Sequence, residues 1–161
     1  MHGTLICVVT ESAENDDAVS QAVAISERLG LRLVLTHVVD GISLGNGNRE
    51  ESITMKGDHT AAERRLAELA RDHGIDESAE RRVEVGDSAT LVGQIASEEA
   101  ADVIVVGART RGWGRRGLES RLAQELETET PVPVLIAPPR NAPPRTRSLQ
   151  TRQTASGAPR R

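Results

Sequence analysis

Five short apolar runs, rich in β-branched residues, alternate with segments of helical periodicity along this chain of 161 residues. The runs lie at 4–9, 31–39, 81–85, 102–107 and 132–137, and their lengths are typical of strands. Strands that are apolar along most of their length are buried on both faces, as in parallel sheets. The pattern predicts an α/β fold: a single doubly wound five-stranded parallel sheet with helices on both faces and right-handed crossovers.

The four segments between the runs carry apolar residues at helical spacing. These are Ala18, Ala22, Ile25 and Leu29 in the first segment, Ala62, Leu66 and Leu69 in the second, Leu91 and Ile95 in the third, and Leu118, Leu122 and Leu126 in the fourth. We expect Asn15 or Asp16 to cap the first helix, Gly30 to end it, and Gly74 to end the second helix. We expect Asp87 or Ser88 to cap the third helix.

Two segments do not fit the packed body. Residues 40–59 are polar and Gly-rich without clear periodicity, which predicts a long loop between the second strand and the second helix. Residues 139–161 contain one large apolar residue, Leu149, and we expect a disordered basic tail after a domain that spans 1–138. From residue 138 onward there are six arginines and no acids, so the preceding residues hold 14 bases against 24 acids, a net charge of −10.

Composition excludes several classes of function. Cys7 is the only cysteine, so neither an internal disulfide nor a multi-cysteine zinc cluster can form. Trp113 is the only aromatic residue besides the histidines, which argues against base stacking on single-stranded nucleic acid. No apolar segment approaches the roughly 20 residues of a membrane span, and the first residues do not resemble a signal peptide. We therefore expect a cytoplasmic protein without membrane insertion.

Three stretches carry a resemblance to a known family. They are "THVVDG", "VEVGDSATLVGQIASEEAADVIVVGAR" and "LAQELETETPVPVLIAPP". In these strings and in the order of its elements, the chain resembles the universal stress protein (UspA-like) family over about residues 3–138. The resemblance implies a Rossmann-like, adenine nucleotide alpha hydrolase-like sheet of order 3-2-1-4-5, and a homodimer formed through the strand at 132–137. It also implies a ligand at the carboxyl ends of the strands, where the strand order reverses.

The resemblance further implies a nucleotide site, with ATP as the cofactor in the ATP-binding branch. The residues placed in it are Thr10, Val38, Gly107, Arg109, Thr110, Ser120, Arg121 and Leu122. That branch carries Gly-x2-Gly-x9-Gly-(Ser/Thr) after the fourth strand, and the four motif positions fall here on Gly107, Thr110, Ser120 and Arg121. Only the first is retained, and side chains replace the glycines that let a backbone cradle phosphate. In the same branch an Asp stands at the position of Thr10.

We interpret the chain as a stress-response binding and regulatory protein with a degenerate nucleotide-binding motif, acting by binding rather than as an enzyme. The alternative is an ATP-binding switch with slow ATP hydrolysis, in which the arginines of 107–117 replace the lost glycines. A third hypothesis is an adaptor whose long loop at 40–59 and basic tail recruit a protein or a polyanion. His37 is expected to be a partly buried strand residue that packs under the site, and Cys7 a buried strand residue. The histidine spacing argues against a metal site.

Overall fold

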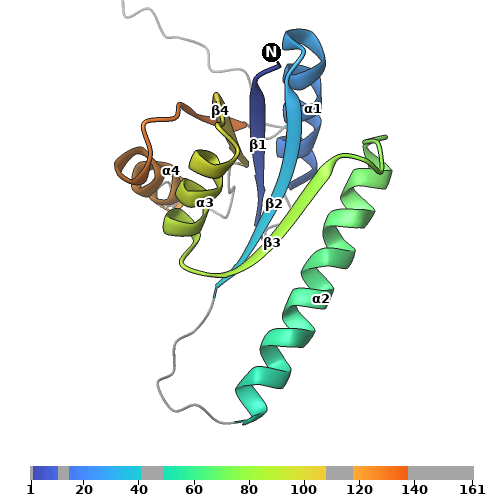
Figure 1. The fold of residues 1–161 in the computed structure, drawn as a ribbon, viewed down its shortest axis with the longest axis vertical. Coiled ribbons are helices and arrows are strands. Elements are labelled where there is room, and N and C mark those ends of the chain that lie inside the picture. Colours follow the sequence, from blue (N-terminus) through green and yellow to red (C-terminus); the bar gives the residue numbers. More distant parts are fainter. Residues whose placement is uncertain (1, 11–14, 41–48, 108–117, 138–161) are drawn as a thin grey trace, which may run out of the picture.

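The computed structural model describes residues 2–10, 15–40, 49–107 and 118–137, and for 40, 49–58 and 118–121 the backbone alone. The elements are β1 Thr4–Val9, α1 Asn15–Leu29, β2 Arg32–Asp40, α2 Arg49–Asp72, β3 Glu80–Gly86, α3 Ser88–Glu98, β4 Val103–Gly107, α4 Leu118–Glu129 and β5 Val134–Ala137. All strand pairs are parallel and the order is β3-β2-β1-β4-β5 (Figure 1), which confirms the predicted fold class. Within the described ranges, no helix combines the length and hydropathy that crossing a bilayer requires.

β1 lies at the centre of the sheet and separates two apolar clusters. Its six residues are all buried. Leu5, Cys7 and Val9 face α1 and α2, whereas Ile6 and Val8 face α3 and α4. The strand alternates between two covered faces, so it needs an apolar residue at every position, and this explains the continuous run that predicted it.

The helix ends follow from single residues. Gly30 and Gly74 have φ angles of +64° and +65°, and each stands just past the end of a helix. Such positive φ angles favour glycine, because other residues meet steric cost there. Asp87 caps α3 by accepting a hydrogen bond from the amide of Thr90. The predicted ends at Gly30 and Gly74 and the predicted cap at Asp87 are confirmed.

Two expectations are wrong. The loop predicted over 40–59 is helical from Arg49, and only residues 41–48 of it lie outside the described part of the chain. The first turns of α2 extend past the edge of the sheet (Figure 1). Because these turns do not pack on the sheet, their sequence carries no apolar stripe that would predict a helix. Leu29, assigned to the core face of the first helix, is 68% exposed because it lies in the last turn of α1, beyond the packed face.

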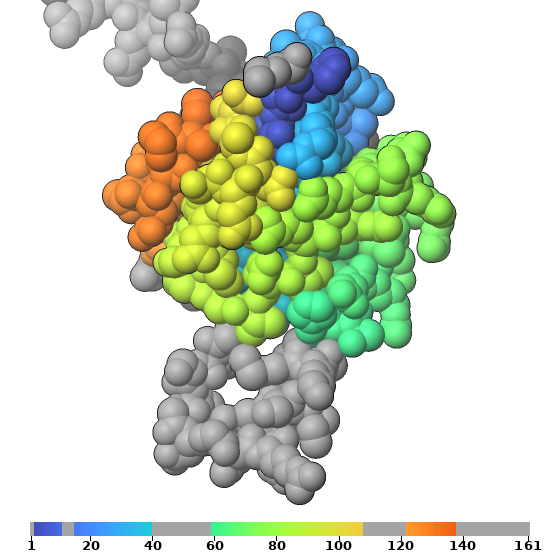
Figure 2. All heavy atoms as spheres, viewed as in Figure 1, coloured from blue at the N-terminus to red at the C-terminus, as the bar shows by residue number. Residues whose placement is uncertain are grey.

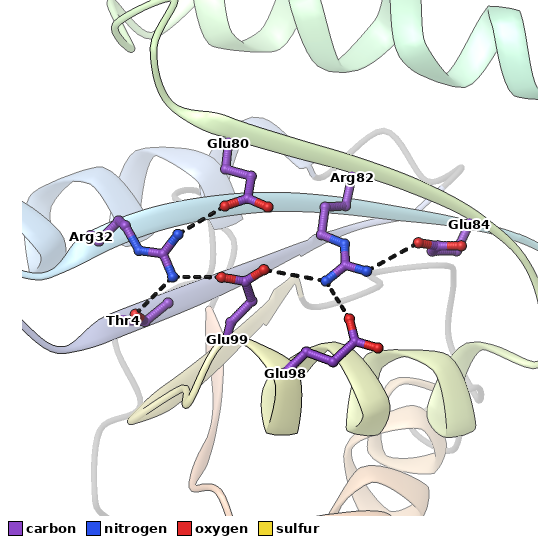
Figure 3. Close-up of polar contacts among 7 residues, drawn as sticks. All are labelled: Thr4, Arg32, Glu80, Arg82, Glu84, Glu98 and Glu99. Atoms are coloured by element: carbon purple, nitrogen blue, oxygen red, sulfur yellow. Dashed lines mark hydrogen bonds and ion pairs between the residues drawn. The ribbon is translucent and has the colours of Figure 1, made fainter.

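A network of charged side chains joins β3 to the end of α3, and these two elements adjoin on the surface in Figure 2. Its ion pairs are Arg32 with Glu80 and Glu99, and Arg82 with Glu84, Glu98 and Glu99 (Figure 3). We call these six residues the charged network. They come from β2, β3 and the C-terminal end of α3 with its C-cap residue Glu99, so the network connects elements that are far apart in sequence.

Glu99 is the residue on which both halves of the charged network converge. Its side chain is 14% exposed and lies 2.5 Å from Arg32 and 3.3 Å from Arg82. The hydrogen bond from Arg32 lowers the pKa of the Glu99 carboxyl, and the positive charges of both arginines act in the same direction. A carboxylate held this way stabilises the fold above its unfolded pKa and loses that contribution as pH falls.

We predict that Glu99→Gln lowers the free energy of unfolding at pH 7 by about 1–2 kcal/mol, because a charged acceptor shared by two arginines is lost. The difference from the parent chain should shrink as pH falls through the lowered pKa of Glu99, because Glu99 itself then becomes protonated. Urea unfolding at several pH values measures this. Glu98→Gln is the matched control, because Glu98 is 60% exposed and pairs with Arg82 alone among the described residues. Equal effects of the two substitutions at pH 7 would contradict the assignment.

Candidate functional site

The strand order places a switch point between β1 and β4. The chain proceeds from β1 outward to β2 and β3, then returns to the other side of β1 for β4 and β5. Connections that leave β1 and β4 therefore diverge to opposite faces of the sheet. In open parallel sheets, the crevice between such connections is where ligands bind, outside the carboxyl ends of the strands.

Three of the predicted site residues meet at this edge. Val9 lies opposite His37 and Val8 opposite Val106 in the parallel register. Thr10 follows Val9 directly, Val38 follows His37, and Gly107 ends β4. In this register Val38 is level with Thr10, and Gly107 is level with Val9, one residue earlier, so the three residues lie near the carboxyl edge on neighbouring strands. Val38 is 8% exposed and belongs to the apolar cluster beneath α3 and α4.

The structure describes the other predicted residues to different extents. Leu122, in α4, is partly buried and packs against the cluster of apolar residues beneath α3 and α4, so its described contacts are those of a core residue. Ser120 and Arg121 belong to the first turns of α4, and the structure describes their backbone only. Arg109 and Thr110 lie outside the described residues. The phosphate half of the site therefore stays a prediction.

Asn15 clamps the chain where it leaves β1, and sequence reasoning missed this role. Asn15 was expected as a cap of α1, but it is the first residue of that helix and is 3% exposed. Its Oδ1 accepts a hydrogen bond from the amide of Thr10 at 2.9 Å, and its Nδ2 donates to the carbonyl of Thr10. Because a side-chain amide can accept and donate hydrogen bonds at once, Asn15 binds both the backbone amide and the backbone carbonyl of Thr10 at the switch point. The only sequence signal was an Asn soon after the strand, which is equally typical of caps and turns.

Carboxylates occupy the N-termini of two helices that begin near this edge. Asp16 and Asp17 lie in the first turn of α1, and Asp16 Oδ1 is 2.9 Å from Nε2 of His73. Asp87 caps α3, and hydrogen bonds from the hydroxyl and amide of Thr90 lower the pKa of its carboxyl. A helix N-terminus attracts anions, and here that attraction is already used by the protein's own acids. A polyphosphate at this edge would meet negative charge.

The described residues near the site show no arrangement for nucleophilic chemistry. Cys7 is fully buried in β1, and burial raises the pKa of its thiol to about 12, so it is not a reactive thiolate. His37 lies within β2, as expected, and at 3% exposed it is more deeply buried than the partly buried residue that the sequence predicts. Across the part of the chain that the structure describes, no group of three or more His, Cys, Asp or Glu could hold a metal ion.

We predict that Asn15→Ala lowers the free energy of unfolding by about 1–3 kcal/mol, because both hydrogen bonds to Thr10 are lost from a buried position. Asn15→Asp should cost more at pH 7, since a carboxylate oxygen would face the Thr10 carbonyl. That extra cost should fall when the carboxyl is protonated and can donate. Urea unfolding at pH 7 and pH 5 measures both, with Gln94→Ala, an exposed polar residue of α3, as control. An Asn15→Ala change within 0.5 kcal/mol of the control would refute the clamp.

Comparison with known proteins agrees with this architecture. A comparison with curated protein sequences finds no match. Among solved structures, the universal stress protein UspA from Lactobacillus plantarum superposes with a TM-score of 0.68 at 17% identity, covering 85% of this chain and 99% of its own. A universal stress protein in complex with cAMP gives a TM-score of 0.58 at 19% identity, covering 84% and 96%.

The universal stress protein from Archaeoglobus fulgidus in complex with dAMP gives a TM-score of 0.53 at 17% identity, covering 84% of this chain and 97% of its own. At these identities the structural likeness establishes the fold. The profile of the universal stress protein family matches residues 1–138. The sequence match and the sheet order agree, and the chain belongs to the universal stress protein family.

Proposed function

We propose that this protein acts in the stress response by binding rather than by catalysis, and that its nucleotide site holds polyphosphates weakly. The observation that carries the proposal is that groups of the protein itself already occupy anion-binding positions at the carboxyl edge. The Thr10 amide is already bound by Asn15, and the N-termini of α1 and α3 already carry carboxylates. Neither a free backbone donor of Thr10 nor these two helix dipoles remains to neutralise a triphosphate.

The residues after β4 support the same proposal. The Gly-x2-Gly-x9-Gly-(Ser/Thr) pattern of ATP-binding relatives meets Thr110, Ser120 and Arg121 at three of its four positions. Thr110 and Ser120 add side-chain atoms where a glycine backbone would approach phosphate oxygens closely, and Arg121 replaces a small hydroxyl with a long cation. Thr10 also lacks the two carboxylate oxygens that an Asp would offer to a ribose.

We further propose a preference for adenine nucleotides that carry a single phosphate. Two structures similar to this chain are complexes with cAMP and with dAMP. A single phosphate brings less negative charge to an edge that already holds Asp16 and Asp17, so its electrostatic cost is lower. The adenine and ribose would rest against Val38 and Thr10.

Calorimetric titration of the full chain, stripped of nucleotide, tests the proposal. We expect no saturation by ATP with Mg²⁺ below about 1 mM, which corresponds to roughly 4 kcal/mol of binding free energy, and tighter binding of cAMP. Combining Ser120→Gly with Arg121→Ser should improve ATP affinity tenfold or more, because the phosphate cradle is partly restored. Arg71→Ser, which removes an exposed cation from the last turn of α2, is the control.

Micromolar ATP binding that Arg121→Ala weakens would overturn this proposal. It would support the ATP-binding switch instead, with the arginines after β4 as the phosphate ligands. Turnover of ATP would then be measured directly on the same preparation.

We also propose that the protein is a homodimer joined through β5. The sheet has two edge strands of opposite character. β3 carries Glu80, Arg81, Arg82 and Glu84, and charge of this kind protects an edge against pairing. β5 has no charged residue, and Leu135 and Ile136 are each 45% exposed. An apolar edge of this kind is stabilised when a second copy covers it.

Ile136→Arg should shift the protein to monomer at concentrations where the parent chain sediments as a dimer, because an arginine would have to be buried unpaired at the interface. Leu29→Arg is the matched control, since Leu29 is also an exposed large apolar residue but lies in α1. Sedimentation velocity at about 10 μM distinguishes the species. A monomeric parent chain, or equal effects of the two substitutions, would contradict an interface at β5.

A further inference from the structure

A cleft of about 510 Å³ lies at the amino edge of the sheet, opposite the candidate nucleotide site. The C-terminal half of α1, the start of β2 and the connection from α2 to β3 enclose it. Its volume is within the range of about 300–1,000 Å³ that is usual for ligand pockets. Val23, Leu33 and Ile75 line it, and each is partly buried against the core, so the cleft has an apolar floor.

The rim of this cleft is acidic. Among the described residues that line it, Glu27, Asp76 and Glu80 are acidic and Arg32 alone is basic. The Arg32 guanidinium already binds Glu80 at 2.8 Å and Glu99 at 2.5 Å. Neither Glu27 nor Asp76 forms an ion pair with any residue that the structure describes. The cleft therefore fits a partner that combines an apolar side chain with neighbouring positive charge.

One segment of this chain has that composition. Residues 138–161 contain six arginines, no acids and a single large apolar residue, Leu149, which stands between Arg147 and Arg152. We propose that the amino-edge cleft binds this segment, with Leu149 against the apolar floor and the two arginines against Glu27 and Asp76. The proposal is independent of nucleotide binding, because the cleft and the candidate nucleotide site lie at opposite edges of the sheet.

The segment is long enough to reach the cleft. The tail leaves the carboxyl end of β5, and the cleft lies three strands away at the amino end of β2, a lateral step of ~14 Å. The length of β1, six residues, adds a step of ~20 Å along the strands. Residues 138–149 are 12 residues and span up to ~40 Å when extended, which exceeds the ~25 Å diagonal and leaves length to follow the surface.

Occupation of the cleft would also control what the tail can bind. Arginines held against Glu27 and Asp76 are not available to a polyanion, so the cleft and an external polyanion compete for the same segment. High salt should release the tail, because the ion pairs at the rim are exposed and screened.

A paramagnetic label next to Leu149 tests the proposal on the full chain. Ser148→Cys can be labelled selectively, because Cys7 is fully buried. We expect the label to broaden the amide signals of Val23, Gly74 and Ile75 in ¹H–¹⁵N spectra at low ionic strength. The same label at Ser156→Cys, farther along the tail, should broaden them less.

Two substitutions should each reduce the broadening at the cleft by threefold or more. Leu149→Ser removes the apolar anchor without touching the folded body, and Glu27→Lys reverses a rim charge. Glu68→Lys, on the exposed face of α2, is the matched control and should leave the broadening unchanged. Broadening that is absent from the cleft, that centres on Thr10 and Gly107, or that survives Leu149→Ser would overturn the proposal.

Mixing ¹⁵N-labelled chain without spin label and spin-labelled chain without ¹⁵N identifies the source of the tail. Broadening that is lost in the mixture shows that each chain binds its own tail. Broadening that is retained shows exchange between two copies, and both results support the cleft as the binding site.

Discussion

The position of β1 between β2 and β4 is the constraint on which the rest of this structure depends. Both neighbours run parallel to it, so every connection must cross back over a face of the sheet, and each crossing is made by a helix. β1 is consequently covered on both sides and buried at every residue. The same arrangement brings the carboxyl ends of all strands to one edge and creates the switch point at Thr10 and Gly107. Core and candidate site are two results of one topology.

The two edge strands of the sheet, β3 and β5, differ in charge. Arg82 of β3 forms ion pairs with Glu98 and Glu99 at the end of α3, so the charged network joins this edge strand to the helix. An apolar strand at the same edge would be prone to pair with another chain. β5 has no such protection, and it is the strand for which we propose a second copy. Asp16, Asp17 and Asp87 lie at the N-termini of α1 and α3, near the carboxyl edge. We propose that their charge makes this edge less suited to polyphosphate.

Much of the fold could be predicted from the sequence because its strands are apolar runs and two of its helices, α1 and α2, are followed by glycines at positive φ. The predicted placement of Thr10, Val38 and Gly107 at one edge follows from the strand order implied by the family resemblance. The early start of α2 could not be predicted, since turns that project past the sheet carry no apolar stripe. The roles of Asn15 and Glu99 were missed for another reason. Each acts through partners that only the folded chain brings near, and the residue type alone does not indicate which partners these are. Arg109 and Thr110 lie outside the described residues, so their part in the site stays a prediction.

The central claim is that the carboxyl edge is a binding edge on which charge disfavours polyphosphates. The most direct test is a ¹H–¹⁵N titration of the full chain with cAMP and, separately, with ATP and Mg²⁺. The account predicts that cAMP shifts the amides of Thr10, Val38 and Gly107, and that ATP reaches no saturation below about 1 mM. Saturation by ATP at micromolar concentration, or shifts that centre on the amino edge instead, would contradict it.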